Sequence, residues 1–83
     1  SREEALVLYA DKIGLTAREG EVYQALLTTD LGVQEIADGL FVSRRVAQRH
    51  VSAIYEKAGV TTRVGLYREF DAWFDEFKTR ERG

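Results

Sequence analysis

Five side chains able to bind a polyanion fall within nine consecutive residues: Arg44, Arg45, Gln48, Arg49 and Ser52. In a helix that begins at Ser43, the first two turns would present them outward, where they could hydrogen-bond to phosphates or base edges. An α-helix fits the major groove of duplex DNA, where arginine can pair with guanine and glutamine with adenine. The spacing therefore predicts a DNA-reading surface. The alternative is an ordinary helical hairpin with a solvated basic face.

The charge distribution supports a local polyanion site. The net charge is −2, but residues 1–42 carry −5, residues 43–63 carry +4 and residues 64–83 carry −1. A short basic segment within an acidic chain is the pattern expected of a locally presented site rather than a uniformly basic binder.

The elements that must position these side chains are all helical. The 83 residues suffice for one domain, contain no proline, and place apolar residues every three or four positions. Thr16 and Glu19 predict a capping box, and Gly14 and Gly59 predict helix ends. The expected helices are about Arg2–Ile13, Thr16–Thr29, Val33–Leu40, Ser43–Lys57 and a last one from Thr61 or Thr62 to about Arg80.

The segment from Val33 to Glu56 has the order of a helix-turn-helix motif: a short helix, a three-residue turn and a longer helix. Ala37 is small enough to let the second helix approach closely. The apolar residues expected to share one core across the pair are Ile36, Leu40, Ala47 and Val51.

Several classes of function are excluded by residue type. The chain has no cysteine and one histidine, His50, so neither a thiolate nor a clustered metal site is expected. No glycine-rich phosphate loop or nucleophile elbow is present, so we expect neither an enzyme nor a cofactor. The longest stretch without a charge is Val22–Thr29, against about 20 residues for a membrane-spanning helix.

Leu15 to about Leu66 resembles the DNA-binding domain of LuxR-type (FixJ/NarL-like) transcriptional regulators. The matching runs are Leu15–Val22, Glu35–Ser43, His50–Val60 and Arg63. The resemblance implies a four-helix domain whose recognition helix spans about 43–57, here with an additional N-terminal helix and an extended C-terminal helix. It further implies sequence-specific binding of double-stranded DNA as the output of a transcriptional regulator.

Transferred by position, the resemblance places the base contacts on Gln48, Arg49 and Ser52. Lys57 and Arg63 fall where the family contacts or organises the DNA backbone, and Glu19 is expected to pair within the domain, with Arg63 as its candidate partner. The other expected backbone contacts are Ser43, Arg44, Arg45 and His50, the last of which could instead pack between helices.

The last helix carries a bulky apolar stripe, formed by Leu66, Phe70, Trp73, Phe74 and Phe77. Exposing it to water would cost several kcal/mol at about 25 cal/mol per Å². We expect it to pack on the N-terminal helix through Leu6, Tyr9 and Ile13, and also to form a homodimer seam. An alternative function follows, in which the chain is a protein-interaction module and this stripe is its working surface.

The predicted organisation has three parts: an N-terminal helix or linker (1–14), the DNA-binding domain (15–66) and an extension of the last helix (67–83). The chain starts without methionine, and we expect an N-terminal sensor or regulatory domain to be missing from it. RNA polymerase is a further candidate partner. The expected location is the cytoplasm, including as the output end of a longer, even membrane-anchored, chain.

Overall fold

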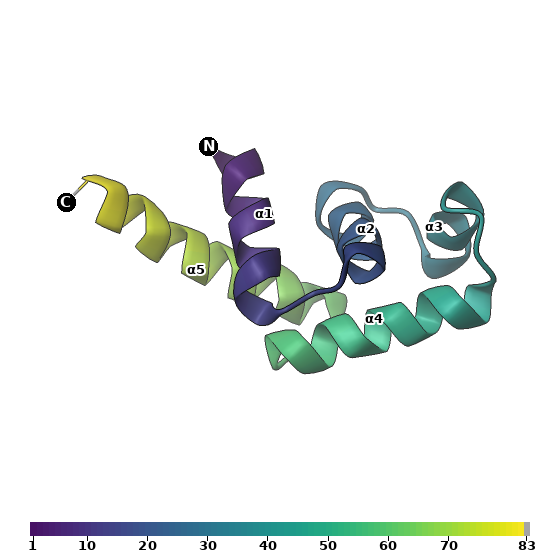
Figure 1. Cartoon of the computed structure of the whole chain (residues 1–83). Helices are drawn as coiled ribbons and strands as arrows, with labels where there is room; N and C mark the ends of the chain where they lie inside the picture. The colour runs from purple at the N-terminus through teal and green to yellow at the C-terminus, as the bar shows by residue number, and fades with distance from the viewer. Residues whose placement is uncertain (83) are drawn as a thin grey trace.

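A computed structural model describes residues 1–82, with side chains up to Arg80. These residues form five α-helices and contain no strand: α1 (Arg2–Ile13), α2 (Ala17–Thr28), α3 (Val33–Gly39), α4 (Arg44–Ala58) and α5 (Arg63–Arg82) (Figure 1). The all-α prediction is confirmed, and the predicted bounds agree with these to within two residues. Gly83, the last residue of the predicted extension, lies outside the described residues.

The helix boundaries follow from local capping chemistry. The Thr16 hydroxyl accepts from the Glu19 amide at 3.2 Å, while the Glu19 carboxylate accepts from the Thr16 amide at 3.0 Å. At the start of α4 the Ser43 hydroxyl accepts from the Val46 amide at 3.1 Å, and the Thr62 hydroxyl accepts from the Gly65 amide at 2.9 Å. Both predicted glycine stops are left-handed, with φ of +77° at residue 14 and +72° at residue 59.

The helices form two groups within one elongated body of 44 × 21 × 21 Å. Helices α2 and α3 pack against the same side of α4, whereas α1 packs mainly against α5 (Figure 1). The C-terminal part of α5 extends beyond these contacts. The α2–α3–α4 group therefore carries the helix-turn-helix motif at one end, and the α1–α5 pair forms the other end.

One core joins the two groups. Its fully buried large side chains include Val22, Tyr23, Leu26, Ile54, Leu66 and Phe70. The Tyr23 hydroxyl donates to the Leu6 carbonyl at 2.6 Å, which ties α2 to α1. Burial raises the pKa of Tyr23 strongly, so this hydroxyl keeps its proton and remains a donor across the physiological range.

Helix α1 covers part of the aromatic stripe of α5. The Tyr9 ring lies 5.6 Å from that of Phe70, edge to face, and 5.5 Å from that of Trp73. The guanidinium of Arg2 lies 5.1 Å above the Phe70 ring. Leu66 and Phe70 are completely buried, whereas Trp73, Phe74 and Phe77 keep part of their surface exposed.

Within residues 1–82, every helix is too short or too highly charged to cross a lipid bilayer.

Candidate nucleic-acid interface

The pairing of α3 with α4 fixes which face of α4 is exposed. Ile36 and Ala37 of α3 are 2% and 0% exposed, and Ala47 of α4 is also fully buried. Because the small side chains of Ala37 and Ala47 let α3 approach closely, one side of α4 is covered along its first two turns. Val51 and Ile54 continue this buried side.

The opposite face of α4 gathers the predicted polar residues. One shallow surface is lined by Arg44, Arg45, Gln48, Arg49 and Ser52, all of them exposed. Their spacing of four residues along two parallel rows keeps them on one side of the helix. Two turns of α4 thus present three guanidinium groups, an amide and a hydroxyl to a single partner.

The electrostatics of this face are positive. The first turn of α4 holds no acidic residue. Among residues with described side chains, no ion pair involves Arg44, Arg45 or Arg49. The N-terminus of a helix also carries a partial positive charge that attracts anions. The face is therefore free to neutralise phosphates.

Two further predicted backbone contacts lie beside this face. The Ser43 oxygen accepts from the Val46 amide as the helix cap, which leaves its hydroxyl proton available for a phosphate oxygen. His50 lies half-buried on the flank of α4 and is not among the residues that line the exposed surface.

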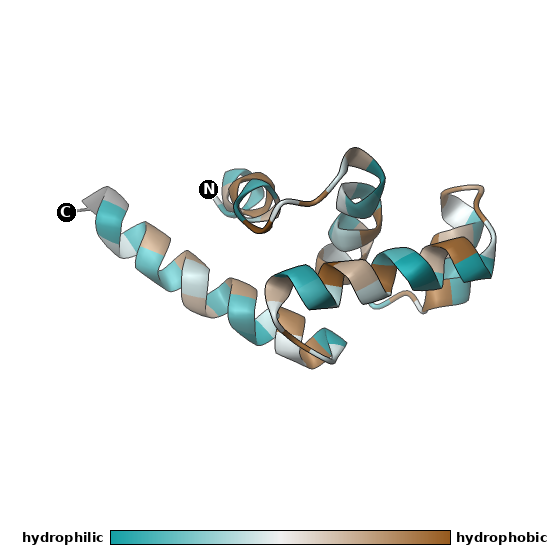
Figure 2. Cartoon of the chain, turned by 60° about the horizontal axis from the view of Figure 1, so that its bottom comes forward, coloured by the Kyte–Doolittle hydropathy of each residue, from teal (hydrophilic) through white to brown (hydrophobic). Residues whose placement is uncertain are grey.

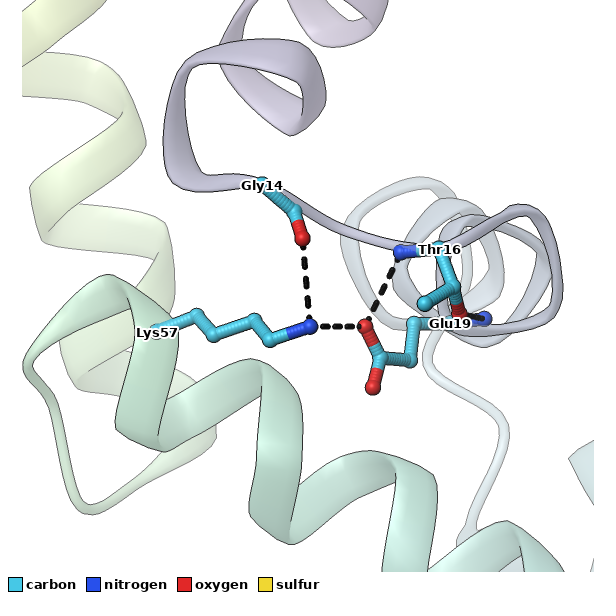
Figure 3. Close-up of polar contacts among 4 residues, drawn as sticks. All are labelled: Gly14, Thr16, Glu19 and Lys57. Carbon is cyan, nitrogen blue, oxygen red and sulfur yellow. Dashed lines mark hydrogen bonds and ion pairs between the residues drawn. The ribbon is translucent and has the colours of Figure 1, made fainter.

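Lys57 is engaged within the chain at the far end of α4 (Figure 3). Its Nζ donates to Glu19 Oε1 at 2.6 Å and to the Gly14 carbonyl at 3.1 Å. The hydrogen bonds that Glu19 accepts from Lys57 Nζ and from the Thr16 amide hold the pKa of its carboxyl group below the ordinary value. The expected pairing of Glu19 with Arg63 is therefore wrong, because Lys57 occupies that carboxylate.

Arg63 instead stabilises the C-terminal end of α2. Its guanidinium donates to backbone carbonyls in and just after that helix, those of Ala25, Leu26, Thr29 and Leu31. The sequence contained a signal for this role. Helix α2 has no basic residue in its last turn, and threonine rather than glycine stands at its C-cap, position 29. Its last carbonyls therefore need donors from elsewhere.

Within the described part of the chain, no group of three or more histidine, cysteine, aspartate or glutamate side chains could hold a metal ion.

Comparison with known proteins agrees with this geometry. Residues 14–70 match the family model described as bacterial regulatory proteins, luxR family. Neither the curated proteins nor the solved structures include a significant match to the chain. The matched segment begins at the C-cap of α1 and ends in α5, so it contains the whole of α2, α3 and α4.

The match fixes the kind of protein. It covers well over half of the chain, includes the complete helix-turn-helix pair, and corresponds to a family that is not enzymatic. The chain belongs to the luxR family of bacterial regulatory proteins, and it is the DNA-binding output domain of a transcriptional regulator.

Proposed function

We propose that α4 enters the major groove as a recognition helix and reads sequence with Gln48, Arg49 and Ser52. Arginine is suited to guanine and glutamine to adenine, because each can form two hydrogen bonds with that base edge. The proposed backbone contacts that fix the helix in the groove are Ser43, Arg44, Arg45 and His50. The observation that carries the proposal is the single exposed surface on which the three base-reading residues and both leading arginines lie.

Lys57 and Arg63 are proposed to organise this interface rather than to contact DNA. Lys57 joins the C-terminal end of α4 to the start of α2, and Arg63 holds the end of α2. Both residues thus hold in place the helices against which α4 packs. The family resemblance led us to expect that these two positions either contact the DNA backbone or organise its contacts. We propose the organising role for both.

We also propose that residues 15–66 form the DNA-binding unit, with residues 1–14 and 67–83 as flanking elements. The protein would act in the cytoplasm, with RNA polymerase as a candidate partner and with an N-terminal sensor domain controlling it.

The test of base reading is Arg49→Ala, assayed on a duplex selected from random sequence and on an unrelated duplex. Losing a bidentate base contact costs about 1–3 kcal/mol, or roughly a 5- to 150-fold rise in Kd on the selected duplex. On the unrelated duplex Arg49 can contribute only charge, so the rise should be much smaller. Fluorescence anisotropy over a salt series measures both affinities.

Arg44→Ala is the matched control, because it removes a guanidinium from the same face. It should weaken both complexes alike and reduce the slope of log K against log salt by about 0.9. Equal losses on both duplexes for Arg49→Ala would reassign Arg49 to a phosphate. A wild-type affinity independent of salt would contradict DNA binding through this face.

A second proposal concerns self-association through α5. Trp73, Phe74 and Phe77 are only half-buried in the monomer, and apolar bands alternate with polar ones toward the C-terminal end of α5 (Figure 2). A symmetric pair of such helices would bury the remaining apolar surface and present two recognition helices to half-sites about one helical turn apart.

The double variant Phe74→Ala, Phe77→Ala tests this proposal by sedimentation equilibrium. We expect it to raise the dimer dissociation constant by at least about tenfold, because two exposed aromatic faces are removed. Binding to a single half-site should change little, since neither residue lies near α4's exposed face. A wild-type protein that stays monomeric at high concentration and on a full two-half-site duplex would contradict the dimer.

A further inference from the structure

The turn between α3 and α4 holds a residue in an unfavourable backbone conformation. Phe41 has φ of +58°, and it is the only non-glycine residue with positive φ among those described. Its amide donates to the Asp38 carbonyl, and the Val42 amide donates to the Ala37 carbonyl. This pair of bonds is the Schellman motif, in which the left-handed position is usually glycine.

The phenyl ring of Phe41 contributes almost nothing to the monomer. It is 94% exposed, compared with 58% for Val7 and 55% for Val64, the next most exposed large apolar residues. A left-handed backbone is unfavourable for a bulky residue, and an exposed ring adds no packing. The left-handed backbone allows the Schellman hydrogen bonds, which glycine would allow without steric cost, so any compensation for the bulky ring must come from outside the monomer.

The position of Phe41 identifies what could cover the ring. Phe41 lies three residues before Arg44, and so within about 10 Å of the first residue of α4. The connection that contains it forms a hydrophobic loop at the end of the molecule where α4 begins (Figure 2). Arg44 and Arg45, which are suited to phosphates, follow directly. A DNA strand bound by these arginines would run beside the loop, and the apolar surface of its sugar–phosphate backbone is the C–H edge of the deoxyribose rings.

We propose that Phe41 is an apolar DNA contact that packs on the deoxyribose of the strand beside the N-terminus of α4. The inference rests on the proposed docking of α4 in the major groove. It assigns a role to a turn residue that bears no charge and no hydrogen-bonding side chain. Glycine in place of Phe41 would make the monomer more stable. In this proposal the phenylalanine ring contributes to DNA binding at the expense of that stability.

The test is Phe41→Gly, measured for both stability and binding. The melting temperature should rise by roughly 4 °C, because glycine relieves the left-handed strain by more than it adds to unfolded-state entropy. Kd should rise by roughly eightfold on selected and unrelated duplexes alike, the effect of losing about 50 Å² of apolar contact at about 25 cal/mol per Å². The salt slope should not change, because no charge is removed.

Two variants complete the design. Phe41→Tyr keeps the apolar ring area and should bind within about twofold of wild type. Val7→Ala shortens an exposed apolar side chain on α1, far along the chain from α4, and should leave Kd unchanged. A salt slope that falls with Phe41→Gly would overturn the apolar assignment, since it would show that phosphate contacts were lost.

Three other results would also overturn the proposal. A Phe41→Gly protein that is more stable yet binds DNA like wild type would place the partner of the ring elsewhere, for example on another protein. A loss that disappears on probes with deoxyuridine in place of thymidine would place the ring on the thymine methyl group. A lower melting temperature would show that the ring stabilises the monomer. If the wild-type protein binds no duplex, the proposed DNA-binding function fails. If the wild type binds and Phe41→Gly binds equally well, only the inference about Phe41 fails.

Discussion

Phe70→Ala is expected to lower the free energy of unfolding by about 3–5 kcal/mol. Phe70 is completely buried, and its ring meets those of Tyr9, Trp73 and Phe74. Truncation would leave a cavity where α1 and α5 meet, and the surrounding aromatic rings cannot collapse fully into it. A domain of this size has a total stability of about 4–12 kcal/mol. The variant should therefore lose at least about a quarter of the wild-type stability, a loss that urea denaturation followed by circular dichroism measures.

Val64→Ala provides the comparison, because Val64 is 55% exposed on the first turn of the same helix. Its free energy of unfolding should stay within about 0.5 kcal/mol of wild type. The two variants separate the roles proposed for the aromatic stripe. If Phe70 served only self-association, Phe70→Ala would shift the dimer equilibrium and leave the unfolding of the diluted monomer unchanged, which would contradict its place in the core.

Features that depend on nearby residues could be predicted from the sequence. The capping box at Thr16, the cap at Ser43 and the stop at Gly59 each involve groups within a few residues of one another. The same locality explains why the exposed face of α4 was predictable: helical spacing alone fixes which of its side chains share a side. The family match then identifies the helix pair to which this face belongs.

Features that depend on how distant helices meet were not predictable in the same way. Glu19 could pair with either of two downstream cations, and only the packing of α2 on α4 places Lys57 within 2.6 Å of it. Arg63 is then left to the carbonyls at the end of α2. Phe41 is a third case, because its side chain gives no sign that a left-handed backbone is required; that follows from the turn geometry between α3 and α4.

Lys57→Met is expected to lower the free energy of unfolding by about 2–3 kcal/mol at pH 7. Methionine keeps the apolar stem but leaves the Glu19 carboxylate, whose side chain is 11% exposed, without its cation. The value is set below that of a fully buried pair because the Lys57 side chain is 34% exposed and solvent screens the interaction. The Gly14 carbonyl also loses a donor, which loosens the junction between α1 and α2. Urea denaturation of both proteins measures the difference.

The pH dependence of the difference in unfolding free energy between wild type and Lys57→Met tests whether the ion pair causes it. In the wild type, hydrogen bonds from Lys57 and from the Thr16 amide lower the pKa of Glu19. A lowered carboxyl pKa stabilises the fold above the unfolded-state value of about 4.3, and this contribution is lost as the pH falls through the folded-state pKa. The gap between wild type and Lys57→Met should therefore be full at pH 7 and narrow as the pH falls below the unfolded-state value of about 4.3 and through the lowered pKa of Glu19.

Arg18→Met is the matched control for this experiment, since it also removes a cation paired with a glutamate near the start of α2. The pair of Arg18 with Glu21 is exposed on both sides, at 58% and 44%. Such pairs contribute about 0–1 kcal/mol, so the control should differ little from wild type at any pH. A Lys57→Met deficit that persists undiminished at pH 3 would assign the loss to packing of the side chain. A deficit no larger than that of Arg18→Met would show that the ion pair at the C-terminal end of α4 does not hold this helix in place.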